Sequence, residues 1–206
     1  MADVKAELYD KKEAMPPEER ERYYEEKLRW LIPYAYEKAP IVKAKMDQAG
    51  VSPHDIRAIK DLEKIPIVHK DELPQLDKQY GVGGGFLAIP PAQVKRIYVS
   101  PGPIYESTPE IEESIHAFAK GLYAGGFRPG DIVLDTFSYH FTPAGMMLDH
   151  GVGRIGAVVI PAGPGNTDIQ IETMHDLGVT GYIGSLRFLL HLLKVAEERG
   201  YDIRRD

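Results

Sequence analysis

The sequence predicts an α/β fold in which a helical N-terminal lead-in is followed by a mainly parallel open sheet with helices on both faces. Two observations carry this prediction. From residue 94 onward, short apolar runs alternate with helical patterns long enough to connect parallel strands. Before residue 90 the chain is charged, helical in pattern and interrupted by prolines. We therefore predict a helical lead-in at 1–90 and an α/β subdomain at 91–206.

The lead-in begins with a helix-start signal. Pro17 precedes Glu18 and Glu19, and proline at the first helical position followed by acids is typical of a helix N-terminus. Pro33 falls inside the same helical pattern and predicts a kink or a break. Further prolines predict short helical pieces up to the glycine-rich residues 81–85. We assign no chemistry to this segment.

The second part contains four candidate strands, at 94–99, 131–137, 157–161 and 180–183. Helical patterns lie at 109–124, 143–153, 167–177 and 186–199. In open α/β sheets ligands bind beyond the carboxyl ends of the strands. The loops expected to form a site are therefore 100–108, 138–145, 162–167 and 184–185. Residues 200–205 resemble a connector toward another strand, so we expect a truncated fold.

Composition excludes several classes of function. The 206 residues carry a formal net charge of -6 with both signs mixed, which makes nucleic acid an unlikely main partner. The absence of cysteine excludes disulfides, thiolate metal sites and a cysteine nucleophile. There is no apolar run of about 20 residues for a membrane span and no signal-peptide pattern after Met1. We therefore expect a cytoplasmic protein.

Residues 94–108 resemble a phosphate-binding loop with part of its chemistry removed. A strand, a glycine-containing loop and a helix N-terminus favour an anion. Pro101 and Pro103 remove N–H donors, however, and Glu106 adds negative charge. The alternative is an ordinary strand-to-helix connector with Ser107 or Thr108 as the N-cap. The candidate nucleotide contacts are Ser100, Gly102, Ser107 and Thr108.

The loops after the later candidate strands suit an apolar pocket with a few orienting polar groups. Each loop also has a purely structural interpretation. The aromatic residues of 138–145 could pack on the sheet. Residues 162–167 could be a tight turn that Asn166 or Thr167 caps, and Ser185 could cap the following helix. We interpret His140 as a hydrogen-bonded histidine and predict no metal ligands, because no second ligand lies at metal spacing. The candidate pocket residues are Tyr139, His140, Phe141, Gly145, Gly163, Gly165, Asn166 and Ser185.

Three segments together carry a family resemblance: residues 125–131 (GGFRPGD), 139–145 (YHFTPAG) and 160–170 (IPAGPGNTDIQ). With the segment at 60–73, they resemble the phenylacetate–coenzyme A ligase family of adenylate-forming enzymes over most of the chain. The resemblance implies the N-terminal part of an ATP-dependent, AMP-forming acyl or aryl coenzyme A ligase. Such enzymes join a carboxylate to ATP as an acyl adenylate and then transfer the acyl group to coenzyme A, with Mg²⁺ assisting the first step.

The resemblance also implies positions for the substrate pocket, the phosphate loop and the catalytic residues. Residues 138–145 would line the pocket for a small aromatic or aliphatic carboxylate. The family's phosphate loop, rich in Ser, Thr and Gly, is altered here. Its adenine-binding segment, ribose-binding aspartate and catalytic lysine correspond to positions beyond residue 206, so the catalytic residues are unknown and we expect the chain alone to be inactive. The alternatives are a non-catalytic ligase-like binding or scaffold subunit, and one half of a split ligase completed by a second chain. Dimerisation is common in such relatives.

Overall fold

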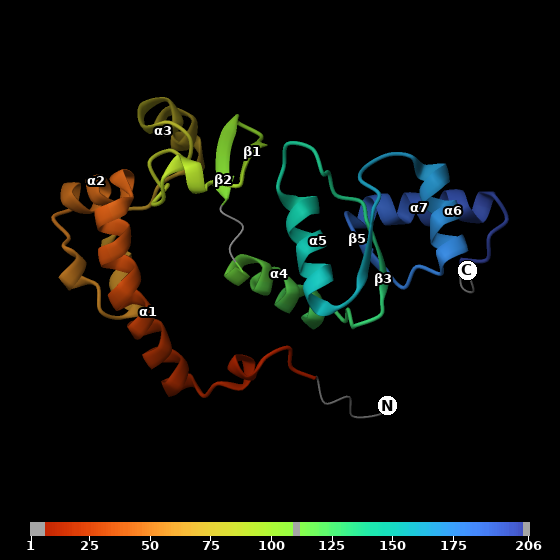
Figure 1. Cartoon of the computed structure of the whole chain (residues 1–206), viewed down its shortest axis with the longest axis horizontal. Coiled ribbons are helices and arrows are strands. Elements are labelled where there is room, and N and C mark those ends of the chain that lie inside the picture. The colour runs from red at the N-terminus through yellow and green to blue at the C-terminus, as the bar shows by residue number, and fades with distance from the viewer. Residues whose placement is uncertain (1–6, 109–111, 204–206) are drawn as a thin grey trace. The chain divides into compact units, whose positions relative to one another are not determined.

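The computed structural model of the chain describes residues 7–108 and 112–203 (Figure 1). It divides into two compact units, one formed by Lys11–Glu110 and the other by Met1–Asp10 together with Ile111–Asp206. The domain division at residue 90 stays a prediction. Across the described ranges, none of the helices combines the length and the hydropathy that crossing a membrane requires.

The unit Lys11–Glu110 is mainly helical, as the sequence predicted. Its long helices are α1 (Pro17–Lys38), α2 (Pro40–Gln48) and α3 (Leu73–Tyr80), and its core gathers Leu28, Ile32, Met46 and Ile56. Short 3-10 helices fill the intervals: η1 (Lys11–Ala14), η2 (Pro53–Asp55), η3 (Ile59–Lys64), η4 (Lys70–Glu72) and η5 (Pro91–Gln93). A carboxylate accepts a backbone N–H at the start of η2, η3 and η4, in the pairs Asp55–Ser52, Asp61–Ala58 and Glu72–His69.

The kink or break expected at Pro33 is not a break, because α1 continues through this residue to Lys38. Proline removes one intrahelical hydrogen bond. Leu28 and Ile32 are both 6% exposed and pack in the core just before Pro33. The burial of these two side chains, worth about 1.5–3 kcal/mol each, offsets the lost bond.

Two antiparallel strands, β1 (Arg96–Ser100) and β2 (Ile104–Thr108), form a hairpin in the same unit. The sequence analysis predicted a strand at 94–99 in the parallel sheet and a loop over 100–108, and the antiparallel hairpin shows that both predictions are wrong. In β2, Ile104 is buried, whereas Tyr105 and Glu106 are exposed. The expected helix is α4 (Glu112–Ala124), and its predicted start at 109–111 lies outside the described residues.

The other unit contains the parallel sheet, in the order β4-β3-β5. Its strands are β3 (Ile132–Asp135), β4 (Val158–Pro161) and β5 (Gly181–Ile183). Leu134 of β3 pairs with Ile160 of β4 and with Tyr182 of β5, both in parallel register. The connecting helices are α5 (Ala144–Ile155) and α6 (Thr167–Leu177), and α7 (Leu186–Glu198) follows β5. These strands and helices confirm the predicted α/β pattern from residue 112 onward.

Helices cover both faces of this sheet (Figure 1). On one face, Ala119 and Leu122 of α4 and Val152 of α5 pack with Val133. On the other, α6 and α7 pack together through Ile171, Leu192 and Ala196 against Tyr182. Successive residues of a strand point to opposite faces, and because β3 is covered on both faces, Val133 and Leu134 are both fully buried.

Candidate functional site

The loops that follow β3, β4 and β5 meet at the carboxyl edge of the sheet. The backbone N–H of Gly163, after β4, donates to the carbonyl of Asp135 at the end of β3 (3.0 Å). The N–H of Thr136 donates to the carbonyl of Ile183 at the end of β5 (2.8 Å). Three of the four predicted loops are therefore neighbours, whereas residues 100–108 belong to the other unit.

The loop after β3 is held by its own polar groups. The Ser138 hydroxyl donates to the carbonyl of His140 (3.0 Å), and the N–H of His140 donates back to that hydroxyl (3.1 Å). The N–H of Thr142 donates to the carbonyl of His140 (2.7 Å), and Phe141 between them has φ of 60°. A positive φ in an aromatic residue is strained and costs about 1–3 kcal/mol. It leaves the Phe141 side chain 76% exposed at the rim of the site.

Tyr139, by contrast, is partly buried behind this loop. A Cβ atom at Gly145 would lie 2.9 Å from Cδ2 of Tyr139 and 2.8 Å from the carbonyl of Ser138, so a glycine is needed for the ring to fit. The Tyr139 hydroxyl lies 3.2 Å from Oδ2 of Asp135 and 3.3 Å from Oδ2 of Asp149 in α5. The sequence analysis missed both aspartates. Asp149 lies six residues into a helical pattern, where an acid ordinarily faces solvent.

Asp135 is a fully buried carboxylic acid. Its Oδ1 accepts the N–H of Phe137 (2.8 Å). Burial raises the pKa of Asp135 to about 6, although the hydrogen bonds from Phe137 and Tyr139 act in the opposite direction, and the charge of Asp149 raises it further. Burial and the two neighbouring carboxylates raise the pKa of the Tyr139 phenol as well. The site therefore contains an acid that changes charge close to neutral pH.

Thr136 closes the site on the β5 side. Its hydroxyl lies within hydrogen-bonding distance of the carbonyl of Ile183 (3.0 Å) and the hydroxyl of Tyr182 (2.9 Å). A Cβ atom at Gly184 would lie 2.0 Å from the Thr136 hydroxyl oxygen, so this position requires glycine. The Ser185 hydroxyl accepts the N–H of Phe188 (3.2 Å) and caps α7, which confirms the structural interpretation of Ser185.

The loop after β4 is a tight turn, as its glycines predicted. Gly163, Gly165 and Asn166 have φ of 67°, 83° and 52°. Gln170, only 2% exposed, donates from Nε2 to the carbonyls of Gly163 (2.8 Å) and Gly165 (2.7 Å). Asn166 occupies the N-cap position of α6, but its side chain makes no capping hydrogen bond, because its backbone is left-handed. The expected capping role of Asn166 is therefore wrong, and Gln170 orders the turn instead.

The predicted phosphate loop is the turn of the β1–β2 hairpin. Residues 101–103 form the turn and Ser100 pairs with Ile104. Gly102 carries the single N–H among these turn residues, since prolines flank it on both sides. Ser107 lies inside β2, so its predicted N-cap role is wrong, whereas the same role for Thr108 depends on residues 109–111, outside the described ranges. The proposed nucleotide contacts of Ser100, Gly102, Ser107 and Thr108 stay predictions.

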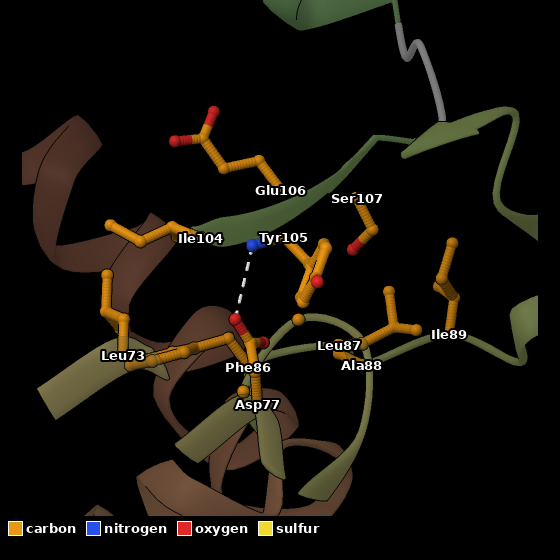
Figure 2. Close-up of a pocket in the computed structure, with 12 residues that line it drawn as sticks. Leu73, Asp77, Phe86, Leu87, Ala88, Ile89, Ile104, Tyr105, Glu106 and Ser107 are labelled. Carbon is orange, nitrogen blue, oxygen red and sulfur yellow. Dashed lines mark hydrogen bonds between the residues drawn. The ribbon is translucent and has the colours of Figure 1, made fainter. Parts of the chain in front are cut away.

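A cavity of about 430 Å³ lies beside β2 (Figure 2). Its walls are mostly apolar, and its polar side chains include Asp77, Glu106 and Ser107. Asp77 accepts the N–H of Tyr105 (3.2 Å), on the edge of β2 that β1 does not use (Figure 2). The charged groups that line this cavity are carboxylates, which repel a phosphate. Among the described residues, no cluster of three or more His, Cys, Asp or Glu could hold a metal ion.

The curated proteins similar to this chain include phenylacetate–coenzyme A ligases from several organisms. The chain is 26% identical over 206 residues to the phenylacetate–coenzyme A ligase of Pseudomonas putida, covering 97% of this chain and 46% of that protein. It is 29% identical over 180 residues to the phenylacetate–coenzyme A ligase of Escherichia coli, covering 84% of this chain and 40% of that protein. The enzyme of the same name from Thermus thermophilus is 29% identical over 170 residues. No protein-family model matches the chain.

Solved structures share the fold. An open conformation of 2-hydroxyisobutyryl-CoA ligase in complex with 2-HIB-AMP and CoA matches with a TM-score of 0.83 and 22% identity, covering 90% of this chain and 42% of that one. The same ligase in its thioesterification state matches with a TM-score of 0.82. The chain thus spans less than half the length of the relatives it matches. The curated matches and the shared fold relate the chain to the N-terminal part of phenylacetate–coenzyme A ligases, as the sequence analysis predicted.

Proposed function

We propose that the chain forms the carboxylate-binding part of an ATP-dependent, AMP-forming acyl or aryl coenzyme A ligase. One observation carries the proposal: loops from β3, β4 and β5 meet at the carboxyl edge of a parallel sheet, in a chain related to phenylacetate–coenzyme A ligases. Ligands bind beyond that edge in open α/β sheets. The whole reaction would join the acid to ATP with release of pyrophosphate and then transfer the acyl group to the thiol of coenzyme A.

The rim residues supply groups that suit an acid with an apolar body. Tyr139 contributes a partly buried ring and Phe141 an exposed one, and both stand in the loop after β3. The turn held by Gln170 contains Gly163 and Gly165, and Gly163 bonds to the end of β3 and brings no side chain to the site. An apolar pocket with a few fixed polar groups is the usual form of a small-molecule site.

The described hairpin turn does not fit the phosphates of ATP. Its Pro-Gly-Pro sequence offers one N–H, and Asp77 and Glu106 place carboxylates beside β2. Phosphate loops use several backbone donors and a cation. We therefore assign no step with ATP or Mg²⁺ to these residues. ATP, Mg²⁺ and coenzyme A enter the proposal as what a complete ligase of this kind would use.

Binding of carboxylic acids to the purified chain tests the proposal. Calorimetric titration with phenylacetate, benzoate and 2-hydroxyisobutyrate should show saturable binding of at least one acid. Phe141→Ala should weaken it by about tenfold, the equivalent of losing roughly 1.4 kcal/mol of contact. Leu190→Ala, at a 58% exposed position of α7, is the matched control and should change nothing. Absence of binding across a broad panel of acids would contradict the proposal.

The open sheet favours a split ligase as a second candidate. Within the described residues β4 and β5 each pair only with β3, and Val158 of β4 is 60% exposed. Unpaired strand edges invite association with another chain. Mixing this chain with a chain corresponding to the second half of its relatives should release AMP from ATP, acid and coenzyme A. Each chain alone should release none. A mixture that binds acid but releases no AMP would favour the non-catalytic binding subunit instead.

A further inference from the structure

We propose that Asp135 and Asp149 are positioning residues that hold Tyr139 by sharing one proton, and thereby fix one wall of the acyl pocket. The role in the pocket rests on the proposed function. The shared proton is a property of the chain itself, because it follows from side chains that lie together in one unit.

The Tyr139 phenol and the carboxyl groups of Asp135 and Asp149 have too few hydrogens for two hydrogen bonds unless one carboxyl is protonated. The Tyr139 oxygen lies 3.2 Å from Oδ2 of Asp135 and 3.3 Å from Oδ2 of Asp149. A phenol has one O–H and donates to one acceptor at a time. If both carboxylates are ionised, one of the two contacts places a carboxylate against the lone pairs of the phenol with no hydrogen between them. One additional proton turns both contacts into hydrogen bonds.

The geometry assigns that proton to Asp135. Oδ1 of Asp135 already accepts the N–H of Phe137, so Oδ2 is the oxygen left for a proton. Protonated Oδ2 then donates to the Tyr139 oxygen, and Tyr139 donates its own hydrogen to Asp149. Asp135 is fully buried, and a buried acid favours its neutral form. Asp149 is only partly buried.

Within 7–108 and 112–203, the charged group that acts on Asp135 is Asp149, and it is an anion, so it cannot replace the proton. Beside Asp135, β4 ends in Pro161 and β5 ends in Ile183, which carry no charge. From α5, Asp149 faces the hydroxyl and acts on Asp135 with a like charge. The loop after β3 contributes His140, an exposed residue whose backbone carbonyl and N–H bond to Ser138. Among these neighbours the shared proton is what compensates the pair of carboxyls.

Nuclear magnetic resonance tests the shared proton directly. With ¹³Cζ-labelled tyrosine, the Tyr139 signal is assigned by its loss in Tyr139→Phe. In the unchanged chain this signal should shift with pH around a midpoint near 6. Asp135→Asn should remove the shift, because its amide N–H donates to the phenol at every pH. Asp149→Asn leaves Asp135 as the titrating acid, and its midpoint should move to lower pH, because the amide supplies the missing hydrogen and the like charge is gone. This variant serves if the buried variant does not fold.

Asp176→Asn is the matched control, since Asp176 is exposed on α6 and the change is chemically identical. It should keep the Tyr139 shift unchanged. A Tyr139 signal that does not move between about pH 5 and 7 would overturn the shared proton. So would a shift that persists in Asp135→Asn, or a midpoint that Asp149→Asn leaves unchanged.

Acid binding separates this inference from the proposed function. If an acid binds, its dissociation constant should fall by about threefold or more from pH 7.5 to 5.5 in the unchanged chain, since protonation of Asp135 removes one negative charge that repels the bound carboxylate. The constant should be flat in Asp135→Asn. If no acid binds although the Tyr139 signal titrates, the proposed function fails and the shared proton stands. If the acid binds with the same pH profile in Asp135→Asn, the positioning role fails.

Discussion

At two positions of the candidate site, Gly145 and Gly184, neighbouring atoms lie too close to admit a side chain. Gly184 and Gly145 are required because their neighbours leave no room for a Cβ atom. The sequence could predict glycines in turns but not this reason, since Thr136 lies 48 positions before Gly184. The same limit explains why Asp135 and Asp149 were missed. Their importance comes from a contact with Tyr139 that only the folded chain creates.

Replacing Gly184 by alanine should destabilise the unit that contains the sheet. A Cβ at this position would meet the hydroxyl oxygen of Thr136 at 2.0 Å and that of Tyr182 at 2.4 Å, so the strand end must shift. The free energy of unfolding should fall by about 1–3 kcal/mol, measured by urea denaturation. Gly153→Ala is the control. With nothing within 4 Å and a helical setting in α5, it should stabilise by about 0.5–1 kcal/mol. Equal effects at both positions would contradict the packing argument.

Asp135 should make stability fall as pH rises. Its folded-state pKa of about 6 lies above the ordinary value of 3.8, so its stabilising contribution is complete below about pH 4 and is lost as pH rises through 6. Asp135→Asn should match the unchanged chain at pH 4 and exceed its free energy of unfolding at pH 8, by up to about 3 kcal/mol. Urea denaturation at both pH values measures this, with Asp176→Asn as the control that follows the unchanged chain. A constant difference between the two pH values would contradict it.

At the scale of elements, the periodic segments were predictable and the hairpin was not. The helices over 112–198 and strands β3 to β5 follow from apolar period and turn residues, and they lie within a few residues of their predicted bounds. Residues 104–108 are polar at three of five positions, and their order depends on pairing with β1. A strand of this kind is specified by its partner. The sequence analysis therefore placed residues 104–108 in a loop, because a single strand of this composition carries no pattern of its own.

The hairpin turn should gain affinity for phosphate when its donors are restored. Pro101→Ser and Pro103→Gly add two N–H groups, and Glu106→Gln removes a charge, while buried Ile104 is left in place. The triple variant should bind inorganic pyrophosphate at least about tenfold more tightly than the unchanged chain, measured by calorimetry. Pro91→Ser, at the exposed start of η5, is the control and should not change binding. Unchanged affinity in the triple variant would show that missing donors are not what limits anion binding here.

At the scale of the whole molecule, the described sheet has two uncovered edges. The chain spans less than half the length of its relatives, and its three parallel strands over 112–203 leave β4 and β5 unpaired on their outer sides. The sequence predicted a parallel sheet from the alternation of apolar runs and helical patterns. It could not predict the strand order, which depends on how α5 and α6 cross between strands.

The outer edge of β4 should drive self-association. Val158 is 60% exposed on that edge and adds an apolar side chain to unpaired backbone groups. Val158→Lys should reduce the associated fraction in sedimentation velocity runs at high protein concentration, because a lysine on an edge strand opposes pairing. Leu190→Lys places the same charge on α7, at a 58% exposed position away from any strand, and separates edge pairing from general surface hydrophobicity. If both variants reduce association equally, the strand edge is not the contact. If only Val158→Lys does so, the same edge is where a completing chain should be sought.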